Sequence, residues 1–133
     1  MSPEVIARKL TKLSQYLEEL VPYRNCKHED FLANHYKIER LIELLVMTAS
    51  DIAFHLLFTK DEPMPGSYRA AFLRLGEMGL VSRELSRNLA LGAGLRNILA
   101  HDYEDIDYVL LHASIPQIVE DITAFIQEVV GLP

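Results

Sequence analysis

Residues 38–57, IERLIELLVMTASDIAFHLL, contain apolar side chains that recur every three or four positions. That spacing places them on one face of a helix, whereas the period-two alternation of a half-buried strand is absent. The face consists of Ile38, Leu41, Ile42, Leu45, Ala49, Ile52 and Leu56. The pattern therefore predicts a long core helix, which we expect to extend from about Asp30 to Phe58.

The sequence on either side continues in helices. Ser2 and Pro3 suit a helix start, and the apolar spacing that follows them continues to Pro22. Residues 60–67, KDEPMPGS, are dense in turn formers and predict a loop. Three more helices are expected, at 68–78, from Ser82 or Ser86 to about His101, and from the acidic segment 102–107 through Val129. We therefore expect residues 1–133 to form one all-α domain, a bundle of about five helices.

Composition places the chain among ordinary globular proteins, with 50% hydrophobic and 24% charged residues. Cys26 is the only cysteine, so no internal disulfide forms, and a reducing cytoplasmic setting is expected. The longest charge-free stretch, 108–119, is too short to span a bilayer, and the amino terminus lacks a signal pattern. No membrane partner is therefore expected.

Charge is unevenly distributed along the chain, whose net charge is −6. Residues 69–96 carry five arginines and two glutamates, net +3, whereas residues 97–133 carry seven acidic groups and no Lys or Arg, net −7. The overall charge argues against a general nucleic-acid coat protein and for no DNA partner. A local patch of Arg83, Arg87 and Arg96 can still guide RNA, although a solvated helix face is the favoured explanation of any single charge.

Metal and nucleotide motifs are missing from the sequence. No Glu is followed by His three positions later, His-Glu-x-x-His is absent, and one Cys cannot build a thiolate zinc site. Asp51 and His55 share a helix face, where a hydrogen-bonded pair is favoured over a metal site. Gly92 and Gly94 lie within a helical pattern, where they allow another helix, from this chain or a second subunit, to approach. We expect no metal and no cofactor.

The segment RNILAHDY, residues 96–103, gathers Arg, Asn, His and Tyr near a helix end. At about 100° per residue, Asn97 and His101 share a face, whereas Arg96 and His101 lie roughly 140° apart. They converge only if Arg96 reaches around the helix, if the helix loosens, or if a two-fold axis brings in a second copy. The alternative is an ordinary helix terminus, at which His favours the negative end of the dipole and Arg pairs with Asp102 or Asp105.

The spacing Arg-x4-His-x-Tyr, met as Arg96, His101 and Tyr103, resembles the signature of the HEPN superfamily, specifically the HepT-like toxins. Further matches follow in the family's order: Asp51-Ile52-Ala53, His55-Leu56, Pro65, Ser67-Tyr68, Ala71-Phe72, Leu75, Gly79, Ile106-Asp107 and Ile115-Pro116. The resemblance extends over roughly residues 30–125. An ordered set of this kind is far more specific than an isolated Arg-x4-His.

The resemblance implies a metal-independent ribonuclease toxin of a type VII HepT/MntA-like toxin–antitoxin system. It implies a nucleotidyltransferase antitoxin as partner, an RNA substrate, and a homodimer with the motif at its interface. Arg96 and His101 would be catalytic, Asn97 would support them, and the antitoxin would adenylylate Tyr103. Two alternatives stay open: a non-catalytic HEPN module that binds nucleotide or a partner protein, and a structural helical dimer without an active site.

Overall fold

The computed structural model describes residues 3–101 and 106–133, and within them it contains six α-helices and no strand. The all-α prediction is therefore confirmed for the described part of the chain. The helices are α1 (Pro3–Leu20), α2 (His28–Ala33), α3 (His35–Thr59), α4 (Tyr68–Glu77), α5 (Arg83–His101) and α6 (Tyr108–Val130), and a short 3-10 turn, η1 (Val21–Tyr23), follows α1.

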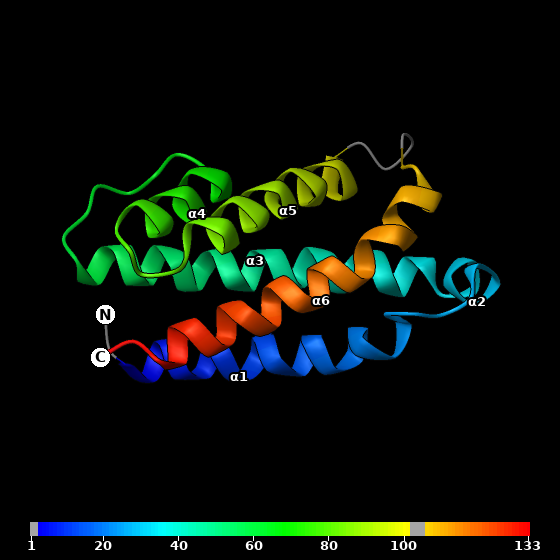
Figure 1. Ribbon diagram of the computed structural model, residues 1–133, viewed down its shortest axis with the longest axis horizontal. Helices are drawn as coiled ribbons and strands as arrows, with labels where there is room; N and C mark the ends of the chain where they lie inside the picture. The colour runs from blue at the N-terminus through cyan, green and yellow to red at the C-terminus, as the bar shows by residue number, and fades with distance from the viewer. Residues whose placement is uncertain (1–2, 102–105) are drawn as a thin grey trace.

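Helix α3 forms the centre of the bundle (Figure 1). The hairpin of α4 and α5 packs along one side of it, and α1 and α6 pack along the other. The predicted apolar face of α3 is buried, and Ile38, Ile42, Leu45 and Ile52 are fully inaccessible. The carboxyl end of α5 and the start of α6 lie at the end of the bundle that carries α2, whereas the start of α1 and the carboxyl terminus lie at the opposite end.

The predicted helix over residues 30–58 is interrupted, and this raises the number of helices above the expected five. Asn34 ends α2, because its side-chain amide donates to the carbonyl of Asp30 at 2.8 Å while its backbone N–H bonds the Phe31 carbonyl at 3.0 Å. The Asp30 carbonyl is thus occupied by a side chain, a competition typical of Asn. Helix α3 then starts anew with the bond from the Ile38 N–H to the Asn34 carbonyl.

A close helix crossing joins α4 to α5. A Cβ at Gly76 would lie 2.4 Å from Ser86 Oγ, so only glycine allows this approach. Ser86 is buried and donates to the Phe72 carbonyl at 2.8 Å, whereas Ser82 Oγ accepts from the Leu85 N–H at the helix start. Gly79 closes α4 with a φ of +72°, the left-handed conformation that glycine adopts readily. This crossing fixes the direction in which α5 carries its carboxyl end.

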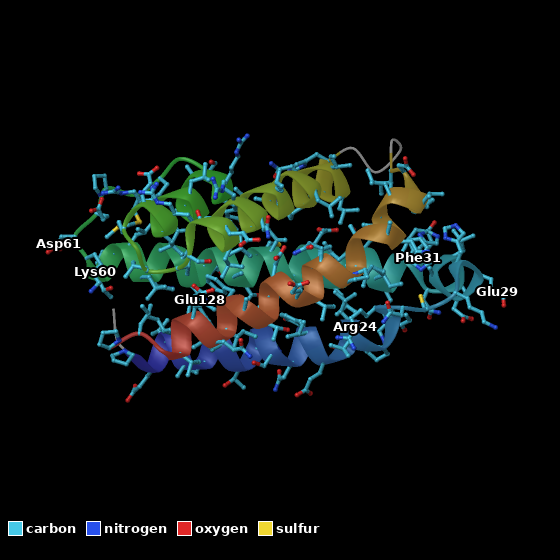
Figure 2. The ribbon with its side chains drawn as sticks, viewed as in Figure 1. Arg24, Glu29, Phe31, Lys60, Asp61 and Glu128 are labelled. Carbon is cyan, nitrogen blue, oxygen red and sulfur yellow. The ribbon has the colours of Figure 1, made fainter. Side chains whose placement is uncertain are left out.

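Helices α3 and α6 are each long and apolar enough, by length and composition alone, to cross a membrane. In this fold, however, α3 is the core helix of the bundle, and its apolar residues contact its neighbours. Figure 2 shows Phe31 of α2 at one end of the bundle and Lys60 and Asp61, which follow α3, at the other.

Candidate active site at the carboxyl end of α5

Arg96 projects from α5 toward the start of α4. Its guanidinium carbon lies 5.3 Å from the centroid of the Tyr68 ring, within the range of a cation–π contact. Its Nε is buried and finds no hydrogen-bond acceptor among the described residues. Its Nη1 lies 3.5 Å from Asn97 Oδ1, which is at the outer limit of a hydrogen bond. Arg96 is thus half-buried on an aromatic ring, and no described carboxylate forms an ion pair with it.

Tyr68 is held firmly beneath that guanidinium group. It is the first residue of α4, and Ser67 caps the helix by accepting from the Ala70 N–H at 3.1 Å. Its ring meets the edge of Phe54 from α3, with the centroids 6.2 Å apart. Tyr68 belongs to the family pattern in the sequence but was not among the predicted site residues, because no periodicity or motif shows which aromatic ring faces an arginine.

His101 is the last residue of α5 and is exposed, as is Asn97 one turn earlier. Arg96 is turned toward α4, and no hydrogen bond joins it to His101 among the described residues. Within one chain the structure therefore does not bring the two motif side chains together, as their separation on an ideal helix predicts. Tyr103, the expected AMP acceptor, lies outside the described residues.

An apolar stripe runs along the outer face of α5 up to His101. Leu91 is 74% exposed and Ile98 is 41% exposed, and Gly94 lies exposed between them. A Cβ at Gly92 or Gly94 would meet no atom of the described residues within 4 Å, so no helix within residues 3–101 and 106–133 approaches either glycine closely. We call Leu91, Gly94 and Ile98 the α5 stripe.

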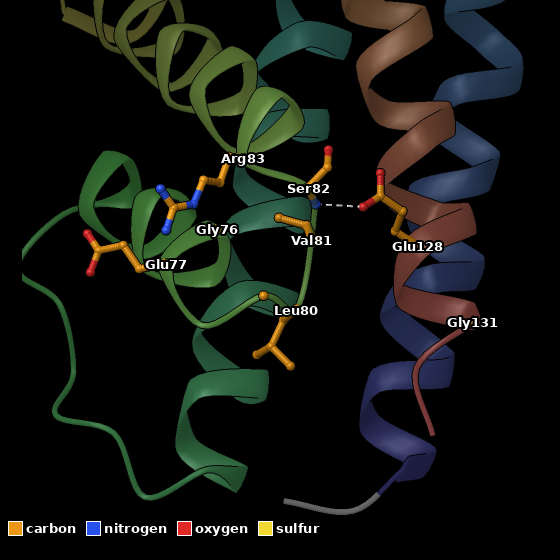
Figure 3. Close-up of a pocket in the computed structure, with 9 residues that line it drawn as sticks. Gly76, Glu77, Leu80, Val81, Ser82, Arg83, Glu128 and Gly131 are labelled. Atoms are coloured by element: carbon orange, nitrogen blue, oxygen red, sulfur yellow. Dashed lines mark hydrogen bonds between the residues drawn. The ribbon is translucent and has the colours of Figure 1, made fainter.

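Arg83 and Arg87 lie toward the opposite end of α5. Arg96 lies thirteen positions after Arg83, which is about 20 Å along the helix axis. Arg83 lines a shallow cavity of about 690 Å³ between the α4–α5 turn and the end of α6, where Glu128 accepts from the Ser82 N–H at 2.7 Å (Figure 3). The structure therefore does not gather Arg83 and Arg87 with Arg96 into one patch, and their role in guiding RNA remains a prediction.

Asp51 and His55 do not form the expected pair. Asp51 instead meets Lys9 of α1, with Nζ and Oδ2 3.5 Å apart. Burial lowers the pKa of His55, and the charge of Lys9 lowers it further. Among the described residues, no three His, Cys, Asp or Glu side chains gather as metal ligands.

A histidine pair that sequence spacing did not reveal lies where α2 meets α6. The Nδ1 atoms of His28 and His112 are 2.9 Å apart, and His112 Nε2 lies 2.8 Å from the Cys26 carbonyl. That carbonyl can only accept, so Nε2 of His112 carries a proton, and in the neutral imidazole Nδ1 of His112 accepts from His28. Phe31 stacks on both imidazoles. The pair is 84 residues apart in sequence, so only the tertiary structure brings it together.

Comparison with known proteins places these features in context. The chain matches the protein-family model described as Ribonuclease HepT-like over residues 9–129. A tRNA nuclease HepT from Aphanizomenon flos-aquae is 32% identical over 110 residues, which are 80% of this chain and 75% of the relative. An mRNA nuclease HepT from Shewanella oneidensis is 34% identical over 76 residues, 57% of each chain. A matching chain from the solved complex of a tri-AMPylated Shewanella oneidensis HEPN toxin with MNT antitoxin has the same fold as this protein. The TM-score is 0.88, the sequence identity is 22%, and the match covers 99% of this chain and 100% of that one.

Proposed function

We propose, given that the chain belongs to the HepT-like family of ribonucleases, that it is an endoribonuclease toxin that cleaves RNA without a metal ion, using Arg96 and His101. The phosphate-binding role of Arg96 is supported by the position of its guanidinium group against the Tyr68 ring. A guanidinium group that lies on an aromatic ring keeps its full charge, and no described carboxylate forms an ion pair with it. Such a group can clamp a phosphate in a bidentate manner and stabilise charge that develops on it.

His101 would move the protons of the reaction. Its imidazole accepts the proton of the RNA 2′-hydroxyl, whose oxygen attacks the adjacent phosphorus while the bond from phosphorus to the 5′-oxygen breaks. A protonated imidazole returns a proton to that leaving oxygen. The products are a 2′,3′-cyclic phosphate and a 5′-hydroxyl. Because the nucleophile belongs to the substrate, no metal-activated water is required. Asn97, on the His101 face, would orient the imidazole or the substrate.

We propose that two copies of the chain assemble through the α5 stripe. Leu91 and Ile98 expose apolar surface, and Gly94 leaves room between them for a second backbone. His101 continues this face, so a two-fold axis near the stripe brings two copies of the motif together. Arg96 and His101 lie roughly 140° apart on an ideal helix and share no hydrogen bond among the described residues, so a second copy would supply the missing partner. The whole chain, residues 1–133, would act as a single domain in this dimer.

We propose further that a nucleotidyltransferase antitoxin of the MntA type controls the toxin by adenylylating Tyr103. The structural relative is described as a tri-AMPylated toxin bound to an MNT antitoxin, which supports a partner of this class. Tyr103 is two residues beyond His101 in sequence. An attached AMP would add bulk and negative charge beside a phosphate-binding site, and both oppose RNA binding. The toxin and its antitoxin would meet in the cytoplasm.

Cleavage of RNA by purified protein, with and without EDTA, tests the mechanism. Wild-type protein is expected to cleave equally well in both conditions, and Arg96→Ala and His101→Ala are expected to lose cleavage while they keep their helical circular dichroism. Arg8→Ala is the matched control, because Arg8 is an exposed arginine on α1. Loss of activity on chelation would refute the mechanism in favour of metal-dependent cleavage, and activity retained by His101→Ala would refute the role of His101. A wild type that cleaves no RNA would favour a non-catalytic module.

Adenylylation is tested by co-expression with the nucleotidyltransferase. Intact mass is expected to increase by one or more AMP units, and peptide mapping to place them on Tyr103. Tyr103→Phe is expected to abolish the mass increase and leave growth unprotected. A neutralised toxin without nucleotide on Tyr103 would instead indicate steric masking by the bound antitoxin.

A further inference from the structure

We infer that Tyr68 is the positioning residue for Arg96, and that its ring holds the guanidinium group ready for the scissile phosphate; this inference rests on the proposed function. An arginine can be fixed in a fold in two ways. A carboxylate fixes it by an ion pair, which also satisfies its charge. An aromatic ring fixes it by attraction to the ring face and leaves the charge available to an anion.

Both arrangements occur on the α4–α5 hairpin. Arg74 forms ion pairs with Glu62 and Glu77, with N···O distances of 3.0 Å to each, so its charge is balanced by carboxylates of the same chain. Arg96 instead lies 5.3 Å from the Tyr68 ring. Among the described residues, its Nε is buried without an acceptor and its Nη1 makes a long, 3.5 Å contact with Asn97 Oδ1, so the Nη end of the guanidinium group can meet a ligand. Arg74 therefore stabilises the fold, whereas the position of Arg96 suits it to bind an anion.

Tyr68 is itself anchored in a manner that suits this role. The Ser67 cap fixes the first turn of α4, and Phe54 supports the ring from α3. The bidentate contact of Arg74 with Glu62 ties the preceding loop, residues 60–67, to the same helix. The backbone that carries the ring is therefore fixed at the start of α4, and the contact with Phe54 restricts the ring itself. A ring held in this way limits the positions of the Arg96 side chain before substrate arrives, which is the preorganisation that favours catalysis.

The contact can be measured without any nuclease assay. In nitrogen-15 spectra, the Arg96 Nε–H is expected to exchange slowly with solvent and to shift upfield under the Tyr68 ring; Arg96→Lys identifies the signal by removing it. Tyr68→Phe is expected to keep both properties, because the ring is retained, and Tyr68→Leu to lose them. Titration with inorganic phosphate is expected to move this signal in the wild type at lower concentration than in Tyr68→Leu.

The kinetic consequence separates positioning from plain packing. Tyr68→Leu is expected to lower kcat by about tenfold and to change KM by less than about twofold, because the contact aligns a group that acts mainly in the transition state. Tyr68→Phe is expected to retain kcat within about twofold. Tyr23→Leu is the matched control: it removes the ring that lies 5.7 Å from Lys37 Nζ, another cation–π contact. It is expected to leave kcat unchanged.

Specific results would overturn the inference. An unchanged Arg96 signal in Tyr68→Leu, an unchanged kcat in that variant, or a Tyr68→Phe variant as slow as Tyr68→Leu would each refute it. If Tyr68→Leu fails to fold by circular dichroism, phenylalanines of increasing fluorination at position 68 replace it, and kcat must then fall as the ring face loses electron density. A wild-type protein that cleaves no RNA would refute the proposed function, while the Nε–H signal and the phosphate titration would still decide whether Tyr68 positions Arg96 for an anion.

Discussion

Substitution of Gly94 by alanine should stabilise the single chain and weaken its dimer. Gly94 lies in the interior of α5, where glycine costs about 1 kcal/mol relative to alanine. A Cβ at this position meets no atom of the part of the chain that the structure describes within 4 Å, so no steric penalty from that part opposes the gain. The free energy of unfolding of the unassociated chain should therefore rise by about 1 kcal/mol, equivalent to about 4 °C in Tm for a domain of this size.

The effect on association has the opposite sign. Gly94 lies between Leu91 and Ile98 in the α5 stripe, where the proposed two-fold axis brings a second backbone close. Each methyl group then enters a packed interface, and overpacking of this kind costs about 1–3 kcal/mol. The dissociation constant of the dimer should increase by about tenfold or more. RNA cleavage at low protein concentration should fall with the dimer fraction.

Urea unfolding and light scattering over a range of protein concentrations measure both effects. Gly94→Ala should be more stable than wild type at concentrations where both are monomeric, and its advantage should shrink or reverse where the wild type is dimeric. Gly92→Ala is the matched control, because Gly92 also has room for a Cβ but lines the groove with Ile118 and Ile122 of α6. It should stabilise the chain and leave the dimer intact. A monomeric wild type at low micromolar concentration, or equal dimer affinity in wild type and Gly94→Ala, would refute the reasoning.

Three further predictions concern the bundle itself. Gly76→Ala should destabilise the fold by about 1–3 kcal/mol in urea unfolding, because the new methyl group overlaps Ser86. A Ser86→Gly background should recover most of this loss. An unchanged urea midpoint for Gly76→Ala would argue against the close crossing of α4 and α5. Burial raises the pKa of Asp121 despite its hydrogen bonds, so the stability that this group contributes is complete below its unfolded pKa of 3.8 and is lost as pH rises through the folded pKa. Asp121→Asn should therefore be more stable than wild type at pH 7 but not near pH 3.8, and the same gain at both values would contradict this assignment. Burial, and then the charge of Asp30, raise the pKa of the Cys26 thiol, so its alkylation by iodoacetamide, followed by mass spectrometry, should be slower at pH 7 than that of the same cysteine in urea-unfolded protein and should increase as pH rises; equally fast alkylation of the folded protein at pH 7 would show a thiolate that the fold does not predict.

Much of the fold followed from local rules. Apolar residues at helical spacing predicted α1, α5 and α6 and most of α3, and turn residues predicted the loop at 60–67. The split at Asn34 was missed, because periodicity counts apolar positions and does not show that one side-chain amide takes a backbone carbonyl. The choice between Ser82 and Ser86 as the cap of α5 was likewise left open by the sequence, since a serine at either position can cap a helix.

The motif that names the candidate site is a property of the sequence alone. Arg96, Asn97 and His101 are recognised by their spacing on one helix, and ideal helical geometry already predicts that Arg96 and His101 point apart. What surrounds Arg96 was decided by the tertiary structure. Tyr68 is 28 positions away and reaches Arg96 only because Gly76 and Gly79 let α4 turn back closely against α5. Helix spacing follows from short-range hydrogen bonds within a segment, whereas the contact between a ring and a cation depends on how two segments pack.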